Sequence, residues 1–198
     1  LKCETDFVAK NEDFIALTKS ILDAALAAKA TTTEEVAALK MDGRTIAELV
    51  TERSGITGEK MELDYYVFVE GATVTAYIHP GNKLASIVSF KEKDVDYQVA
   101  RDIAMQVAAM NPISLDRNSV PEKIVQQELE IGKEKARQEG KPEAILDRIA
   151  EGRLNKFFSE STLLEQAFIK ESKQTVSDYL KANKATATAF KRVTLNVE

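Results

Sequence analysis

The chain has 198 residues, of which 44% are hydrophobic and 30% charged, a balance typical of a globular protein with a packed core. Its net charge of −5 disfavours nucleic acid as a partner, because binding to a phosphate backbone relies on an excess of Lys and Arg. The single cysteine, Cys3, excludes a disulfide within the chain and indicates a reducing compartment, and no apolar run is long enough to predict a membrane span.

The first quarter of the chain has the periodicity of helices. Apolar residues spaced by three and four positions predict a helix over about 13–28, with Asn11 as its N-cap. The threonines at 31–33 interrupt this pattern and can cap a short second helix over 34–40. A third helix is predicted over 45–53, because two glycines follow it closely.

The pattern then changes to the two-residue period of strands. Alternating and β-branched residues predict three strands, over 61–70, 72–79 and 84–90. Turn-forming residues at 70–71 and 80–82 separate them. Such short connections cannot make parallel crossovers, so we expect an antiparallel meander.

The second half of the chain is mainly helical. One apolar stripe predicts a helix over 94–110. Two helices over 121–138 and 142–158 are joined so closely that they must form an antiparallel hairpin, and the narrow apolar stripe of the first indicates a protruding arm. The last predicted elements are a candidate strand over 163–169, a helix over 175–180 and a strand over 185–197. Together the elements predict an α+β fold.

Enzyme signatures are missing from the sequence. The segment 55–60 superficially resembles a phosphate loop, but its spacing is wrong and a helix-to-strand turn is the better interpretation. Cys3 and His79 can be imagined as a nucleophile and its base, yet a small buried thiol and a turn histidine are simpler explanations. We therefore expect no enzymatic activity, no cofactor and no metal site.

The most distinctive segment lies near the start of the chain. Residues 5–8 read Thr-Asp-Phe-Val and place a carboxylate beside a large aromatic ring, ahead of a helix that has its own apolar stripe. Two interpretations are open: Asp6 caps the next helix while Phe7 packs onto Phe14, or Phe7 is a rigid wedge that enters another protein. His79 raises the same choice, because a histidine beside a Pro-Gly turn can bond to the backbone or reach a partner.

Several ordered segments resemble the elongation factor Ts family. The matching segments are Cys3–Val8, Tyr77–Lys83, Ile103–Pro112, Glu151–Phe158 and Leu163–Phe168. Asn82 and Ala167 depart from the family pattern, which usually has Gly and Pro at these positions. The family promotes guanine-nucleotide exchange on the GTPase elongation factor Tu, so the resemblance implies a cytoplasmic factor of translation elongation.

The family fold implies two subdomains, each with a small antiparallel sheet flanked by helices, plus a protruding helical hairpin. We expect the first core subdomain over 1–70, the second over 71–114 and 160–198, and the inserted hairpin over 115–159. The family also begins with a small ubiquitin-associated-like module. Because the chain starts on Leu1 rather than Met, we expect it to be the core and dimerisation region without that module.

The resemblance also implies a mechanism. Phe7 would insert between helices of the nucleotide-binding domain of elongation factor Tu and disturb the groups that hold Mg²⁺ and the β-phosphate, with Asp6 acting beside it. The second subdomain, including the final strand, would grip another domain of the GTPase. The implied partner-binding residues are Thr5, Asp6, Phe7, Val8, His79 and Gly81.

A passive interaction module is the main alternative function. Such a module would bind a partner without releasing nucleotide and would dimerise through 121–158. A homodimer is therefore a second expected type of partner, whereas nucleic acid and membranes are not expected.

Overall fold

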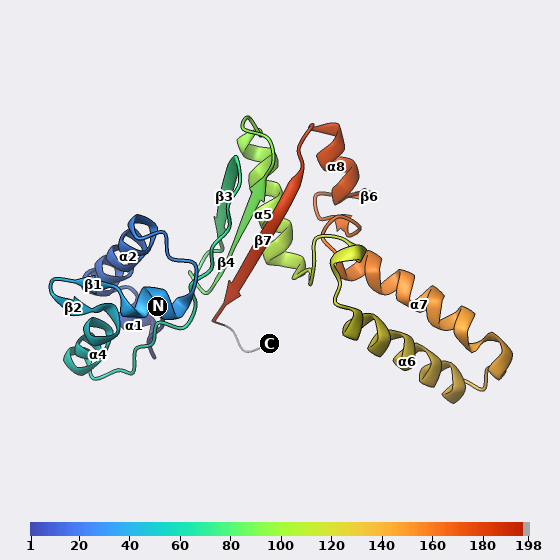
Figure 1. The fold of residues 1–198 in the computed structure, drawn as a ribbon, viewed down its shortest axis with the longest axis horizontal. Coiled ribbons are helices and arrows are strands. Elements are labelled where there is room, and N and C mark those ends of the chain that lie inside the picture. Colours follow the sequence, from blue (N-terminus) through green and yellow to red (C-terminus); the bar gives the residue numbers. More distant parts are fainter. Residues whose placement is uncertain (196–198) are drawn as a thin grey trace. The chain divides into compact units, whose positions relative to one another are not determined.

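The computed structural model describes residues 1–195, which form two compact units (Figure 1). The first unit comprises Leu1–Phe68, and the second begins at Val69. Each unit has its own hydrophobic core. Helices and small antiparallel sheets alternate along the chain, which confirms the α+β fold class. The finer division into 71–114 with 160–198 and an inserted 115–159 stays a prediction, and its last three residues lie outside the described part.

The helices of the first unit follow the predicted pattern with shifted ends. Asn11 caps α2, and its side-chain oxygen accepts hydrogen bonds from the backbone of Asp13 and Phe14. The last helix passes through Gly55 and ends at Gly58, which adopts the left-handed conformation (φ 74°) that favours glycine. The elements of this unit are α1 (Asp6–Ala9), α2 (Glu12–Ala27), α3 (Thr33–Ala38), β1 (Lys40–Met41), β2 (Arg44–Thr45) and α4 (Ile46–Thr57). The one-turn helix α1 and the short β1–β2 pair were not predicted.

The apolar stripe of α2 builds the core of the first unit. Phe14 and Ile21 are buried there together with residues from α1, α3, α4 and the segment that follows α4. This buried cluster consists of Val8, Phe14, Ile21, Ala25, Ala30, Val36, Ile46, Val50 and Met61. The stripe predicted from the sequence is thus only partly the face that packs, because Leu22 and Ala28, which it included, are exposed.

The predicted strand over 61–70 is wrong. All ten residues of this segment are described by the structure, and none of them joins a sheet. An isolated antiparallel bridge links Glu62 to Lys2. The backbone N–H of Tyr66 donates instead to the side chain of Thr33, and the Tyr66 hydroxyl donates to the carbonyl of Ala30. The Thr33 side chain thus satisfies a backbone N–H that a neighbouring strand would otherwise bond, and the Tyr66 hydroxyl adds a second tie to the first unit.

The second unit is built on a three-stranded antiparallel sheet in the order β3–β4–β7 (Figure 1). β3 (Thr73–Ile78) and β4 (Leu84–Phe90) form the predicted hairpin, and β7 (Ala187–Thr194) pairs with β4 from far along the chain. The three-stranded meander expected over 61–90 is therefore corrected: the last strand of the chain, rather than 61–70, completes the sheet. The predicted end of that strand at Val197 lies outside the described residues.

One face of the sheet is covered by α5 (Tyr97–Met110). Val88 and Phe90 of β4 face this helix and are fully buried with Ile103 and Val107. Ser86 lies on the same face and donates a hydrogen bond to the carbonyl of Ala104. The apolar stripe predicted for this helix is therefore the stripe that packs on the sheet.

The two long helices form the predicted antiparallel hairpin. α6 (Glu122–Gln138) and α7 (Leu146–Ser161) pack chiefly against each other, and Gly132 lets them approach closely at Ala150. At the base of the hairpin, Arg117 pairs with Glu165 and lies over the ring of Phe158. Short 3-10 turns precede each helix, at η1 (Arg117–Ser119) and η2 (Glu143–Ile145).

The predicted strand over 163–169 is shorter than expected. Only β5 (Ala167–Phe168) is a strand there, and it pairs with β6 (Glu171–Thr175) before the short helix α8 (Val176–Ala182). Buried Gln106 of α5 explains this, because its side-chain amide bonds to Gln166, to the carbonyl of Ala167 and to the N–H of Ile169. Side-chain hydrogen bonds therefore replace part of a sheet ladder.

Candidate functional site

The Thr-Asp-Phe-Val segment forms a single helical turn in the first unit. Thr5 is the N-cap of α1, and its hydroxyl oxygen accepts a hydrogen bond from the backbone N–H of Val8. Val8 is buried in the core of the unit, whereas 86% of the Phe7 surface is exposed. Consecutive residues of a helix point about 100° apart, so burying Val8 turns Phe7 outward.

The exposure of Phe7 separates the two interpretations left open by the sequence. A ring that packed onto Phe14 would be at least half covered, and Phe14 is instead buried against other core residues. The N-caps are Thr5 for α1 and Asn11 for α2, so Asp6 caps neither helix. Phe7 is thus a large apolar side chain presented to solvent beside a carboxylate.

A glutamate from a distant part of the unit fixes the start of this turn. One oxygen of the Glu59 carboxylate accepts hydrogen bonds from the backbone N–H groups of Glu4 and Thr5, both at 3.1 Å. The other oxygen accepts from the Thr5 hydroxyl at 2.5 Å. These bonds, that of the Thr5 hydroxyl foremost, hold the pKa of Glu59 below its usual value. Glu59 is therefore a charged acceptor for three donors in front of α1.

The two segments joined by Glu59 are also linked by their backbones. Lys2 and Glu62 exchange N–H···O bonds of 3.0 and 3.2 Å, and the N–H of Lys60 donates to the Glu4 carboxylate at 3.2 Å. The Lys2 ammonium lies 3.1 Å from Glu62 and 3.0 Å from Asp64, and its pKa is raised by its hydrogen bonds to these two groups. Hydrogen bonds and ion pairs thus hold the first residues of the chain against the segment that follows α4.

Cys3 lies beside this turn but is poorly suited to act as a nucleophile. Its side chain is half-buried, packs against the core of the first unit and donates to the carbonyl of Thr5. Burial, followed by the negative charge of Glu59, raises the pKa of the Cys3 thiol. A raised pKa keeps the thiol protonated, and the thiolate is the reactive form.

His79 and Gly81 lie in the second unit, in the turn between β3 and β4. The N–H of His79 donates to the carbonyl of Leu84, and the N–H of Asn82 donates to the carbonyl of His79. Gly81 has a φ of 97°, a conformation that L side chains rarely adopt. His79 itself is exposed, and its Nδ1 lies 3.0 Å from the hydroxyl of Tyr77, whose ring in turn lies under the guanidinium of Arg101.

The structure therefore divides the expected partner-binding residues into two groups. Thr5, Asp6 and Phe7 form an exposed turn of the first unit, with Val8 as the buried anchor of that turn. The other group, His79 with Gly81, is an exposed turn of the second unit. Both groups lie at the surface of their own unit, where a macromolecular partner can reach them.

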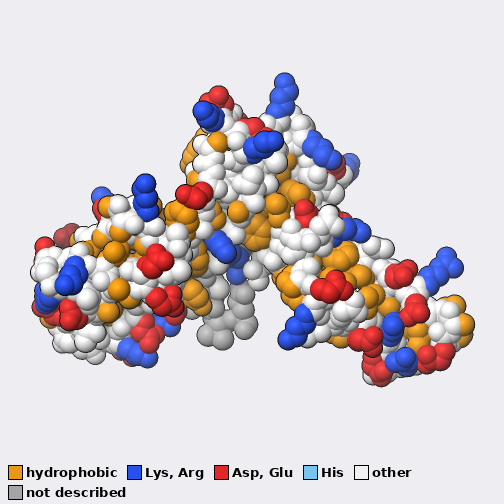
Figure 2. Space-filling model, viewed as in Figure 1, with side chains coloured by type: hydrophobic (Ala, Val, Ile, Leu, Met, Phe, Trp, Pro, Cys, Tyr) orange, Lys and Arg blue, Asp and Glu red, His pale blue; other side chains and the backbone are white. Residues whose placement is uncertain are grey.

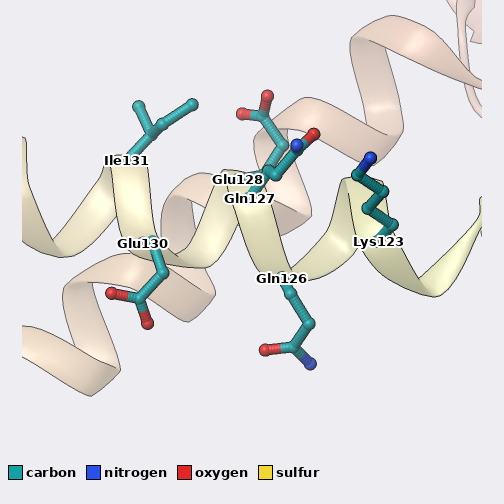
Figure 3. A pocket seen from close by; sticks show the side chains of 6 residues that line it. All are labelled: Lys123, Gln126, Gln127, Glu128, Glu130 and Ile131. Atoms are coloured by element: carbon teal, nitrogen blue, oxygen red, sulfur yellow. The ribbon is translucent and has the colours of Figure 1, made fainter.

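The surface hollow along α6 has no arrangement suited to a small ligand. Its lining residues are Lys123, Gln126, Gln127, Glu128, Glu130 and Ile131. Figure 3 shows that Gln126 and Glu130 point to one side of the helix, whereas Lys123 and Ile131 point to the other. These groups diverge, so they do not converge on a common ligand.

Other classes of site find little support in the described residues. Among residues 1–195, no group of three His, Cys, Asp or Glu side chains is placed to hold a metal ion. Within the same residues, no helix combines the length and the apolar character that a membrane crossing demands. On the face shown in Figure 2, positive and negative side chains are interspersed, and a continuous basic stripe of the kind that tracks nucleic acid is not seen there.

Sequence reasoning missed Glu59. From the sequence alone, residues 55–60 are interpreted as a helix-to-strand turn. The only local pattern there is the glycine that ends the helix, and it indicates no contact of Glu59. The partners of Glu59 are Glu4 and Thr5, more than fifty positions earlier in the chain. Such a contact depends on how the unit folds, and neither segment contains a pattern that indicates it.

Comparison with known proteins agrees with this geometry. The family model described as elongation factor TS matches residues 4–197. An elongation factor Ts of Azobacteroides pseudotrichonymphae is 56% identical over 200 residues, an alignment that covers all of this chain and 73% of the relative. One of Porphyromonas gingivalis strain ATCC 33277 is 53% identical over 201 residues with the same coverage, and one of Cytophaga hutchinsonii is 45% identical, over 99% of this chain and 72% of the relative. The chain belongs to the elongation factor Ts family.

Proposed function

We propose that this protein is a guanine-nucleotide exchange factor that binds elongation factor Tu with GDP and promotes GDP release during protein synthesis. Membership of the elongation factor Ts family supports a nucleotide-exchange role of this kind. The observation that carries the proposal is the 86% exposure of Phe7 on a turn anchored by buried Val8. The activity belongs to the cytoplasm and uses no cofactor of its own.

In this proposal the ring of Phe7 is the element that acts on the GTPase. The ring enters between helices of the nucleotide-binding domain and displaces the groups that hold Mg²⁺ and the β-phosphate. Complete burial of such a side chain contributes about 1.5–3 kcal/mol, and that free energy is available only in the complex. Asp6 lies next to the ring and brings a negative charge toward groups that support the metal.

Thermodynamic linkage sets a strict condition on this mechanism. If the protein weakens GDP binding by some factor, GDP must weaken binding of the protein by the same factor. Coupling between two sites is ordinarily about 1–3 kcal/mol, and an effective exchange factor needs the upper part of that range. The cellular excess of GTP over GDP, and not the exchange factor, then decides which nucleotide rebinds.

The turn of the second unit supplies a second proposed contact. His79 and Gly81 are exposed at the end of the β3–β4 hairpin, where they can meet the GTPase near its nucleotide site. The second unit, including β7, binds another domain of the partner. This second contact holds the two proteins together while the Phe7 ring inserts. Thr5 and Val8 contribute by holding the turn that carries Phe7.

A passive interaction module is the alternative function. The helical hairpin favours it to some extent, because Ile131 of α6 and Ile145 before α7 leave 45% and 40% of their surfaces exposed. A second copy of the chain can cover such residues. In this case the protein would bind elongation factor Tu, or itself, without accelerating nucleotide release.

Release of fluorescent GDP from elongation factor Tu distinguishes these functions. The GTPase is loaded with a fluorescent GDP, mixed with excess unlabelled GDP, and the release rate is followed as the protein is added. An exchange factor raises the rate in a saturable manner at substoichiometric amounts. If binding is detected but the release rate stays at its spontaneous value, the passive module is correct and the exchange function is not.

A further inference from the structure

We infer that Glu59 is a positioning residue for nucleotide exchange: it holds the turn that presents Phe7 without touching the GTPase itself. The inference rests on the proposed function, because it assigns Glu59 a role through Phe7. It starts from the three hydrogen bonds that the Glu59 carboxylate accepts from Glu4 and Thr5, immediately before α1.

The turn that carries Phe7 needs such support. α1 has only four residues, and isolated helices shorter than about 12 residues are marginal in water. Phe7 itself is almost fully exposed, so its ring provides little packing that would hold the turn. Buried Val8 fixes one side of α1, and the hydrogen bonds at its start must fix the other.

The Thr5 hydroxyl transmits the effect of Glu59 to the helix. It donates its proton to Glu59 and at the same time accepts a hydrogen bond from the N–H of Val8, at 3.3 Å. A hydroxyl has a single proton. When Thr5 donates it to the carboxylate, the oxygen lone pairs remain free to accept from the N–H groups at the start of α1. Glu59 therefore orients the cap of α1.

Glu59 is itself held in place. It follows Gly58, the left-handed residue that ends α4, and its carbonyl accepts a hydrogen bond of 2.6 Å from the hydroxyl of Ser54. Its own N–H donates to the hydroxyl of Thr57. The C-terminal end of the twelve-residue helix α4 thus holds the Glu59 carboxylate in place. The carboxylate in turn holds the start of the four-residue helix α1. Rigid support of this kind lowers the ordering cost of binding.

A double-mutant cycle in the GDP-release assay tests the inference. We expect Glu59→Ala to slow release at subsaturating protein by about threefold to tenfold, because a smaller fraction of molecules presents the ring correctly. Glu59→Gln should retain more activity, since its amide oxygen can still accept from the two backbone N–H groups. In a Phe7→Ala background, Glu59→Ala should change the rate by less than about twofold, because groups that act through one another are not additive.

Glu35→Ala is the matched control. The Glu35 carboxylate accepts from the N–H and hydroxyl of Thr31 in the same unit, so it is a similar exposed clamp that does not contact the turn of Phe7. We expect this variant to accelerate GDP release from elongation factor Tu as much as the parental protein does. An equal loss for Glu35→Ala and Glu59→Ala, or the same loss from Glu59→Ala with and without Phe7, would overturn the inference.

Hydrogen exchange tests the positioning without the GTPase. Glu59→Ala should speed exchange of the Ala9 and Lys10 amides, which bond to Thr5 and Asp6, by about tenfold while leaving core amides of α2 unchanged. Unchanged exchange of these two amides in Glu59→Ala would refute the role of Glu59. If the parental chain fails to accelerate GDP release, the proposed function is wrong, and this exchange result still decides the positioning role.

Discussion

Asp102 lies in the core of the second unit, and we predict that Asp102→Asn destabilises that unit at neutral pH and less so in acid. The residue is 3% exposed, and its carboxylate accepts hydrogen bonds from Gln98 at 2.7 Å and from the Tyr179 hydroxyl at 2.8 Å. The Lys170 ammonium lies 2.5 Å away. Burial raises the pKa of Asp102, but the bonds from Lys170, Tyr179 and Gln98 outweigh burial and hold it below the usual value. The carboxylate therefore joins α5 to the β5–β6 turn and to α8.

The magnitude follows from the partners that the substitution leaves behind. Hydrogen bonds to a charged group contribute about 1.5–3 kcal/mol each, and breaking a fully buried ion pair costs about 3–5 kcal/mol. The Lys170 side chain is 46% exposed and can turn to water, so the lower part of these ranges applies. We expect a loss of about 2–3 kcal/mol, equivalent to a fall in Tm of roughly 6–9 °C.

The pH dependence gives the sharper test. A carboxyl group whose pKa is lower in the folded than in the unfolded protein stabilises the fold above its unfolded pKa, about 3.9 for Asp, and loses this contribution as the pH falls through the folded pKa. Urea unfolding at pH 7, 5 and 3.5 should show the full difference between parent and Asp102→Asn at the first two values and a smaller one at the third. The control Tyr179→Phe removes one donor to the carboxylate but keeps the ring stacked on Phe168 at 4.1 Å, so its loss should be about 1.5 kcal/mol. Parental stability of Asp102→Asn at pH 7, or a loss that stays constant in acid, would refute this reasoning.

Two further predictions concern packing in the second unit. A Cβ at Gly132 would lie 3.2 Å from the Cα of Ala150, so Gly132→Val should destabilise the hairpin by about 1–3 kcal/mol, whereas a Cβ at Gly152 meets nothing within 4 Å and Gly152→Ala should stabilise it by about 1 kcal/mol. Thermal unfolding followed by circular dichroism compares the pair, and equal shifts of the same sign would contradict the close approach of the helices. Gln106→Leu should cost about 2–4 kcal/mol in urea unfolding, because it leaves backbone groups of the β5 segment without their buried partner, and parental stability would show that water replaces the amide.

Local patterns predicted the helices because the stripe that packs is visible in the sequence. In α2 the spacing of Phe14, Ile21 and Ala25 gives both the helix and its buried face, and Asn11 marks its start. α5 and the two helices of the hairpin follow the same rule. In each case the signal spans a few turns and does not depend on distant residues.

Strand pairing was less predictable because it depends on partners elsewhere in the chain. The segment 61–70 has the composition of a strand, but the side chain of Thr33 takes up the backbone N–H of Tyr66 that a ladder would have used. The edge beside β4 is filled by β7, about a hundred positions away. Alternation shows that a segment can be a strand but does not identify its neighbour.

The candidate site shows the same limit. The sequence pointed to Phe7, yet packing onto Phe14 and projection into solvent were compatible with the same local residues, and the 86% exposure of Phe7 separates them. Glu59 was missed for a related reason, because its contact with Thr5 connects two segments that lie far apart in the sequence. The role assigned to Phe7 itself remains a prediction that kinetics must test.

The most direct test of the proposed exchange mechanism is the rate of fluorescent-GDP release from elongation factor Tu with Phe7→Ala. Central aromatic residues of interfaces often contribute 2 kcal/mol or more, so we predict a release rate lowered by about thirtyfold, with a Tm unchanged because the ring is 86% exposed. The control variant is Tyr97→Ala, which removes an aromatic side chain that is 70% exposed in the second unit. With this variant, elongation factor Tu should release GDP at the rate seen with the parental protein. A Phe7→Ala protein that is folded and as active as the parent would contradict the account.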